Sequence, residues 1–192
     1  MKGAFALLLL LPLAVAVAQA PETWPIDPAR SQVQFSVRKF WITRARGTLP
    51  QLQGTLRRID TGQGDGFVEV DATVDVVKLQ MDDADDREHA LGADFFDAAR
   101  YPWIRFASGP IPSGELVAGG TVTGELTLHG ERHPVTLRLQ PSACPGRPLG
   151  CVIRVRGSIS RSRFGMRSLR GVLSDKVELD LSISVTLPKP GP

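Results

Sequence analysis

The chain has 192 residues, of which 42% are hydrophobic and 22% are charged, with 23 Lys and Arg against 20 Asp and Glu. This composition excludes a disordered chain, a collagen-like chain and a polytopic membrane protein, and it suits a single domain with a sizeable core. The small positive charge does not indicate nucleic acid binding, because the basic residues are spread along the chain and separated by acidic ones.

The N-terminus has the pattern of a secretory signal peptide. Lys2 precedes an apolar run over residues 4–18 that ends in Ala-x-Ala steps, and such a run is too short to span a bilayer. We predict a signal peptide over residues 1–18, with Ala20 as the alternative cleavage site. The exported protein would then contain no integral membrane segment, although transient membrane contact stays open.

After the signal peptide, residues 19–187 are expected to form one domain, followed by a flexible, proline-rich tail over residues 188–192. Two cysteines, Cys144 and Cys151, flank a segment rich in Pro and Gly. In an oxidising compartment we expect them to form a disulfide, and closing a loop of about eight residues contributes about 2.5 kcal/mol on the chain-entropy model. A redox role is disfavoured because the Cys-x-x-Cys spacing is absent.

Alternation of apolar and polar residues dominates the rest of the chain and predicts half-buried antiparallel strands. Eight strands are expected, over residues 33–37, 44–58, 68–76, 103–108, 122–128, 135–139, 153–159 and 177–187. Eight strands suffice to close a small barrel, but a two-sheet sandwich would show the same alternation.

One short helix is predicted over residues 82–91, inserted after the third strand. Asp82 or Asp83 can cap its N-terminus, and Gly92 follows its last turn. The acidic residues at its start could be read as a metal site, but the positive end of the helix dipole explains them better.

Few residues could carry chemistry. The chain has three histidines, His89, His129 and His133, and no serine in a Gly-x-Ser-x-Gly motif. His129 and His133 are four residues apart across a predicted turn, so a metal site stays open beside a structural role. We therefore expect no catalytic residue, no metal and no cofactor.

The inward-facing positions of the predicted strands are occupied by residues with hydrocarbon side chains or by glycine. Ala72, Gly124 and Gly157 fall in phase with the larger inward residues, which leaves room for a ligand that would itself be apolar. A filled barrel, in which the aromatic residues after the helix are ordinary core, is the alternative.

Four segments together resemble one family, the YceI-like proteins, which are periplasmic polyisoprenoid-binding proteins with a lipocalin-like barrel. They are Trp24-Pro-Ile-Asp-Pro with the strand that follows it, Asp94-Phe-Phe-Asp with Tyr101-Pro-Trp-Ile-Arg-Phe, Gly124-Glu-Leu-Thr-Leu-His-Gly with Pro134-Val, and Arg161-Ser-Arg-Phe-Gly-Met with Asp175-Lys-Val-Glu-Leu. The four segments follow one another along this chain in the same order as in members of the family. The chain departs from the family at Arg30, Arg38 and Asp86-Arg87, so head-group contacts do not carry over at those positions.

The resemblance implies an all-β fold: an eight-stranded antiparallel lipocalin-like barrel located in the periplasm. Its ligand would be a polyisoprenoid such as a prenyl quinone or prenyl phosphate, or a fatty lipid, which the protein carries or buffers. The residues expected to line the cavity are Phe35, Val37, Val70, Ala72, Val74, Phe95, Phe96, Trp103, Phe106, Leu126, Leu128, Ile153, Val155, Phe164, Met166, Leu179 and Leu181. Candidates for orienting the head group are Asp94, His129, Arg161 and Arg163.

Two other functions remain open at this stage. A quinone-linked redox or stress protein would need an acid, a base or a redox centre near the bound head group, and only the histidines qualify. An interaction module with a filled barrel would bind no lipid. The sequence does not choose between a monomer and a homodimer.

Overall fold

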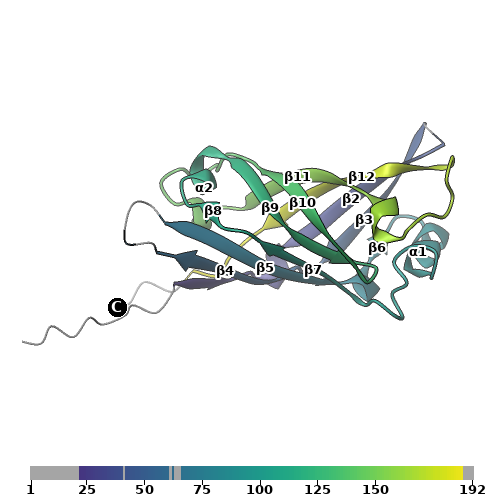
Figure 1. The fold of residues 1–192 in the computed structure, drawn as a ribbon, viewed down its shortest axis with the longest axis horizontal. Helices are drawn as coiled ribbons and strands as arrows, with labels where there is room; N and C mark the ends of the chain where they lie inside the picture. The colour runs from purple at the N-terminus through teal and green to yellow at the C-terminus, as the bar shows by residue number, and fades with distance from the viewer. Residues whose placement is uncertain (1–21, 41, 61, 63–65, 188–192) are drawn as a thin grey trace, which may run out of the picture.

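The computed structural model describes residues 22–40, 42–60, 62 and 66–187. The predicted signal peptide and the predicted tail lie outside these residues. The described part is a strongly curled antiparallel sheet with short helices at its ends (Figure 1). The expected all-β barrel class is therefore confirmed.

Twelve strands are present in the described part of the chain. They are β1 (Thr23–Pro25), β2 (Gln32–Lys39), β3 (Thr43–Pro50), β4 (Gln53–Ile59), β5 (Phe67–Asp75), β6 (Gln80–Met81), β7 (Trp103–Ser108), β8 (Ile111–Pro112), β9 (Gly120–Leu128), β10 (Glu131–Leu139), β11 (Ile153–Ser160) and β12 (Leu173–Ile183). The helices are α1 (Ala84–Leu91) and α2 (Glu115–Ala118), with short 3₁₀ turns η1 (Pro28–Arg30), η2 (Val76–Lys78), η3 (Pro148–Gly150) and η4 (Arg161–Phe164).

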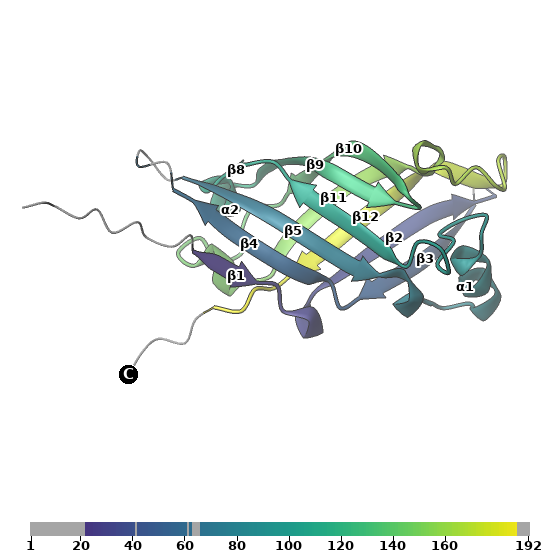
Figure 2. The same cartoon turned by 60° about the horizontal axis from the view of Figure 1, so that its bottom comes forward.

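The strands follow the order β1-β4-β5-β7-β9-β10-β11-β12-β2-β3-β6, and β8 pairs with β5. Two short strands bring the sides of this path together. β6 follows β5 after one 3₁₀ turn and pairs with β3. β1 pairs with β4, and its neighbour Ile26 forms a bridge to Val185 after β12. The curled sheet seen in Figure 2 is held at both edges in this way.

The strand count differs from the expected eight for two reasons. The run predicted as one strand over residues 44–58 is divided into β3 and β4, because Gln51 between them has a left-handed φ of 58°. The strands β1, β6 and β8 have two or three residues each, too few to show an alternating pattern.

The predicted helix is confirmed as α1, which follows β6. Asp83 caps it by accepting a hydrogen bond from the backbone N–H of Asp86 at 2.8 Å, and Gly92 follows its last residue. The turn between β9 and β10 consists of His129 and Gly130, with φ values of 53° and 76°. Two positive φ values in a two-residue loop match the twist of an antiparallel hairpin.

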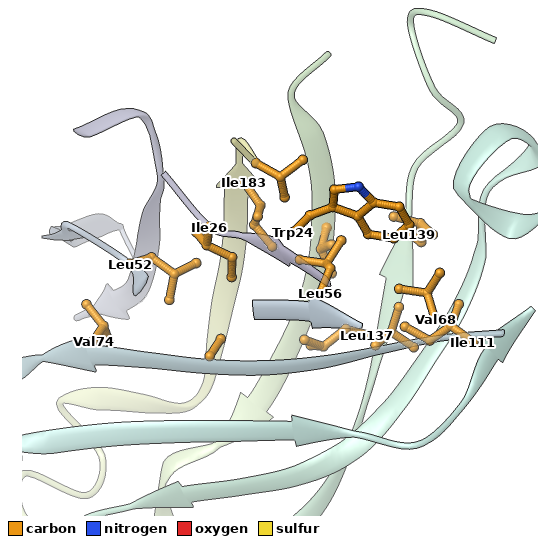
Figure 3. Packing of buried hydrophobic residues seen from close by; sticks show 14 of the residues in the cluster. Trp24, Ile26, Leu52, Leu56, Val68, Val74, Ile111, Leu137, Leu139 and Ile183 are labelled. Atoms are coloured by element: carbon orange, nitrogen blue, oxygen red, sulfur yellow. The ribbon is translucent and has the colours of Figure 1, made fainter. Parts of the chain in front are cut away.

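The end of the barrel at β1 is packed with apolar side chains (Figure 3). Trp24 of β1 lies beside Leu139, close to Leu56 and Ile183. Leu56 is only 2% exposed. These side chains pack together and close this end of the barrel, and Leu56, Leu139 and Ile183 also line the interior space.

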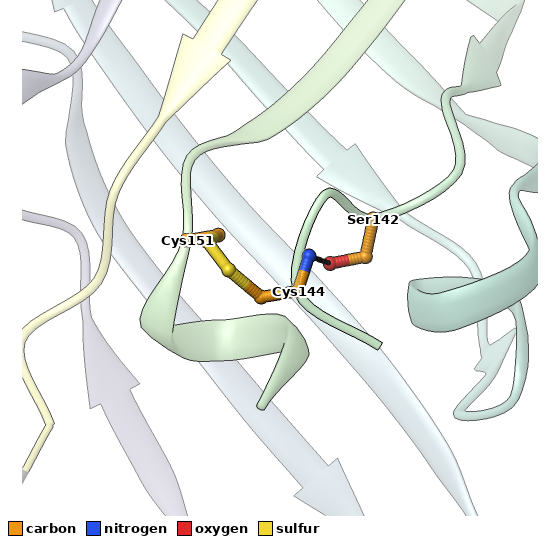
Figure 4. Close-up of a disulfide and its surroundings, with 3 residues drawn as sticks. All are labelled: Ser142, Cys144 and Cys151. Atoms are coloured by element: carbon orange, nitrogen blue, oxygen red, sulfur yellow. Dashed lines mark hydrogen bonds between the residues drawn. A yellow bond between two sulfur atoms is a disulfide. The ribbon is translucent and has the colours of Figure 1, made fainter. Parts of the chain in front are cut away.

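The predicted disulfide is present between β10 and β11, where Cys144 and Cys151 are bonded with their Cα atoms 6.0 Å apart (Figure 4). The Ser142 hydroxyl accepts a hydrogen bond from the backbone N–H of Cys144 at 3.0 Å. The bridge therefore closes the connection between two neighbouring strands.

Candidate functional site: an apolar cavity

A cavity of about 380 Å³ runs inside the barrel, within the range of small-molecule sites. Side chains from β2, β3, β4, β5, β7, β9, β10, β11 and β12 line it, together with residues of α1 and of the segment between η4 and β12. All but four of its lining residues are apolar. The four polar ones are Lys39, Asp86, His89 and Arg161.

Most of the residues predicted to line a cavity do line it. They are Phe35, Val37, Val70, Ala72, Val74, Phe95, Phe96, Phe106, Leu126, Leu128, Ile153, Val155, Met166, Leu179 and Leu181. The two exceptions are Trp103 and Phe164.

Trp103 lies on the outer surface of β7 and is 40% exposed. Its neighbour Ile104 lines the cavity together with Phe106. Residues 103 and 106 are three apart and so face opposite sides of a strand. Placing Trp103 inside with Phe106 was wrong because it did not follow the two-residue period.

Phe164 is buried, but it packs in a separate cluster with Leu126, Leu128, Val135 and Met166. Two histidines hold it. The carbonyl of Phe164 lies 3.0 Å from Nδ1 of His129, and the His133 ring packs edge-on against the Phe164 ring at 5.2 Å. Phe164 therefore fills the space beside the cavity wall and does not line the cavity.

Of the three small inward residues, Ala72 lines the cavity, but the two glycines do not leave the open space expected of them. A side chain on Gly124 would collide with the ring of Phe106 at 2.6 Å, and one on Gly157 would collide with Leu137 at 2.5 Å. Each glycine therefore makes room for a large neighbour to lie flat against the wall.

The empty space appears instead as incomplete burial of inward side chains. Val33, Val70, Leu179 and Leu181 all line the cavity, yet each is only partly buried. Inward-facing residues of a filled barrel would be enclosed by their neighbours. These half-covered apolar side chains show that the barrel is hollow along β2, β5 and β12.

Three of the polar lining residues belong to α1 or pair with it, and α1 lies at the end of the barrel opposite α2 (Figure 1). Lys39, the last residue of β2, places Nζ 2.9 Å from Oδ1 of Asp86. The hydrogen bond and negative charge of Asp86 raise the pKa of Lys39. Nδ1 of His89 donates a hydrogen bond to the backbone carbonyl of Asp85, 2.7 Å away. We call this polar end of the cavity the mouth.

Arg161, the fourth polar residue, is 4% exposed. Its guanidinium donates four hydrogen bonds to backbone carbonyls, those of Met166, Ser168, Leu173 and Ser174, at 2.7–3.2 Å. Burial lowers the pKa of this group. Arg161 therefore holds the segment between η4 and β12 in place at the edge of the cavity.

The predicted head-group residues are not brought together. Asp94 and Arg163 are exposed and do not line the cavity, and His129 contacts Phe164. Only Arg161 of the four is a lining residue.

Lys39, Asp86 and His89 also line the cavity, although the sequence pattern did not predict them there. Lys39 continues the inward series 33, 35, 37, so the strand period could have identified it. Asp86 and His89 are three residues apart and share one side of α1, but only the tertiary fold places that side over the barrel.

The two histidines four residues apart, His129 and His133, both contact Phe164. Nδ1 of His129 is hydrogen-bonded to the Phe164 carbonyl, while the His133 ring packs against the Phe164 ring and its Nε2 lies 3.9 Å from Glu131. Among the residues described, no group of three or more His, Cys, Asp or Glu side chains could hold a metal ion. No helix in the described part of the chain is long and apolar enough to cross a membrane.

The sequence and the fold are similar to those of known proteins. Protein YceI from Escherichia coli O157:H7 is 26% identical over 155 residues, which cover 79% of this chain and 78% of that protein. The crystal structure of BcnA from Burkholderia cenocepacia matches with a TM-score of 0.66 and 25% identity, covering 84% of this chain and 99% of that chain. A polyisoprenoid binding domain from Saccharophagus degradans, implicated in plant cell wall breakdown, matches with a TM-score of 0.62 and 18% identity, covering 86% and 98%. The model of the YceI-like domain matches residues 24–185, and the chain therefore belongs to the YceI-like family.

Proposed function

We propose that this protein binds one polyisoprenoid or similar long-chain lipid inside its barrel and carries or buffers it in the periplasm, without chemical turnover. The observation that carries the proposal is the hollow, almost wholly apolar interior with its polar residues at the edge. The name of the Saccharophagus degradans neighbour, a polyisoprenoid binding domain, supports the same ligand class.

The tail of the ligand supplies most of the affinity in this proposal. Burial of apolar surface is worth about 0.8 kcal/mol per CH₂ group, and a chain of isoprene units offers many such groups. A hydrocarbon chain also loses no hydrogen bonds on entering an apolar cavity.

The head group stays at the mouth. Lys39 and Asp86 already form an ion pair there. The guanidinium of Arg161 already donates four hydrogen bonds to backbone carbonyls. The mouth therefore favours a small polar head group that completes these contacts. A charged group that had to displace the Lys39–Asp86 pair would bind less well.

A binding assay with matched variants tests the proposal. Delipidated protein is titrated with a fluorescent polyene fatty acid, and unlabelled prenyl lipids then compete for it. In Val70→Phe the added ring occupies the cavity, whereas Asp71→Phe adds the same ring to an exposed outer position of the same strand. Excluding two CH₂ groups would cost about 1.6 kcal/mol, roughly a tenfold loss of affinity.

We expect that loss in Val70→Phe and unchanged binding in Asp71→Phe. Equal binding by both variants, or no saturable binding by the unaltered protein, would overturn the proposal.

A further inference from the structure

The mouth of the cavity is bordered by large apolar side chains exposed to solvent. Phe40 is 56% exposed, Ile42 is 88% exposed and Leu169 is 50% exposed. Phe40 and Ile42 lie at the tip between β2 and β3, and Leu169 lies in the segment between η4 and β12. We call these three residues the apolar rim.

The apolar rim is one continuous feature of this end of the barrel. The backbone N–H of Phe40 donates to the carbonyl of Val172 at 2.8 Å, and Lys39 is opposite Leu173 in the sheet register. Both β2 and β12 end or begin at this side of the molecule, near α1 (Figure 1). Leu169 and Lys39 also line the cavity, so the rim leads directly into it.

Positive charge accompanies the apolar rim. The stretch from residue 161 to 172 contains four arginines and no acidic residue. Arg161 is buried, but Arg163, Arg167 and Arg170 are exposed, and none of these three forms an ion pair within the described part of the chain. The acidic residues at this end include those of α1, where Asp86 is paired with Lys39, and Asp175, whose carboxylate accepts hydrogen bonds from Ser160 and Ser162.

Exposed apolar side chains beside unpaired arginines are the combination that binds an anionic membrane surface. The apolar groups enter the interface between head groups and acyl chains, while the arginines attract the negative lipids. Neither group has a partner in the described fold that would explain its exposure.

We propose that the apolar rim and Arg163, Arg167 and Arg170 dock the barrel, mouth first, on the surface of an anionic phospholipid bilayer. The docked orientation places the cavity entrance at the acyl region, so a lipid passes between bilayer and barrel without crossing water. Lipid transfer rests on the proposed function, but docking itself does not.

Vesicle flotation tests the docking. The full-length exported protein is mixed with vesicles of phosphatidylethanolamine and phosphatidylglycerol, or with vesicles of phosphatidylcholine alone. We expect binding to the anionic vesicles, weakened by added salt, and little binding to the neutral ones. Phe40→Ser/Ile42→Ser and Arg167→Gln/Arg170→Gln should each lower the affinity about tenfold.

Matched controls use equivalent residues at the opposite end of the barrel. Val152→Ser removes an exposed apolar residue beside the disulfide, and Arg138→Gln/Arg154→Gln removes two exposed arginines of β10 and β11. These variants should bind vesicles as the unaltered protein does. An equal loss of vesicle affinity in the test variants and in the control variants, or no vesicle binding by the unaltered protein, would overturn the docking.

Lipid content and oligomeric state distinguish a failure of the proposed lipid binding from a failure of the proposed docking. Phe40 and Ile42 do not line the cavity, so their double variant should keep any lipid that native mass spectrometry finds in the unaltered protein. Vesicle binding by a protein that never holds lipid would contradict the proposed function and would still support the docking. A dimer that dissociates in Phe40→Ser/Ile42→Ser, together with absent vesicle binding, would show that a second copy covers the rim.

Discussion

Arg161 gives the sharpest mutational prediction, because the sequence predicts a ligand-binding role for it and the structure shows a supporting one. Its four hydrogen bonds reach the carbonyls of Met166, Ser168, Leu173 and Ser174. Arg161→Met keeps much of the apolar stem and removes every donor. A net value of about 1 kcal/mol for each bond predicts a loss of about 4 kcal/mol in the free energy of unfolding.

Arg163 is the matched control, since it lies two residues away in the same 3₁₀ turn and is exposed. Arg163→Met should change the free energy of unfolding by no more than about 0.5 kcal/mol. Urea unfolding followed by circular dichroism measures both values by linear extrapolation. Equal stability of the two variants would refute the supporting role of Arg161.

Hydrogen exchange locates the effect in the structure. In Arg161→Met the backbone amides between residues 165 and 174 should exchange faster, because the segment loses the side chain that ties it together. Unchanged protection in this segment, with the whole domain destabilised, would show that Arg161 acts through the core instead.

Three other perturbations have defined outcomes. Cys144→Ser/Cys151→Ser should lower the free energy of unfolding by about 2.5 kcal/mol, as measured by urea unfolding of the double variant and of the unaltered protein with its disulfide intact. An unchanged free energy of unfolding would contradict the stabilising role of this bridge. Leu79→Ala, at a buried position that does not line the cavity, should cost about 2–5 kcal/mol, and Leu181→Ala should cost less because its side chain already borders empty space; the reverse order in the same assay would argue against a hollow interior. Burial raises the pKa of Asp175, but hydrogen bonds from Ser160 and Ser162 outweigh it and hold the pKa below its usual value. The stability that Asp175 adds is therefore present above the ordinary pKa of 3.8 and is lost as the pH falls through the lower folded value. Asp175→Asn should accordingly be less stable than the unaltered protein at pH 7, with the gap closing in acid; a gap that widens in acid would show the opposite sign.

The strands were predictable because an antiparallel sheet with one apolar face repeats every two residues. That rule correctly placed Val70, Leu126 and Leu181 on the cavity wall. The same rule, applied strictly, would also have found Lys39 and rejected Trp103.

The mouth was less predictable because its residues meet only through tertiary structure. The acidic start of α1 is explained by capping at Asp83, and nothing local distinguishes Asp86 from its neighbours. Its pairing with Lys39, 47 residues away, depends on how α1 folds over the end of β2.

The buried state of Arg161 could not be read from the sequence either. An arginine in a run of arginines is usually solvated, and the backbone carbonyls that satisfy Arg161 come from a segment without regular secondary structure and from the start of β12. Such contacts follow from the path of the chain, which has no local sequence pattern.

The proposed function requires that the barrel is hollow and holds a lipid. Native mass spectrometry of the protein exported by a bacterial host tests it most directly, followed by organic extraction and identification of the released molecule. We expect a single stoichiometric prenyl or long-chain lipid for each barrel. A mass equal to that of the protein alone, unchanged after incubation with prenyl quinones, prenyl phosphates and fatty acids, would contradict it.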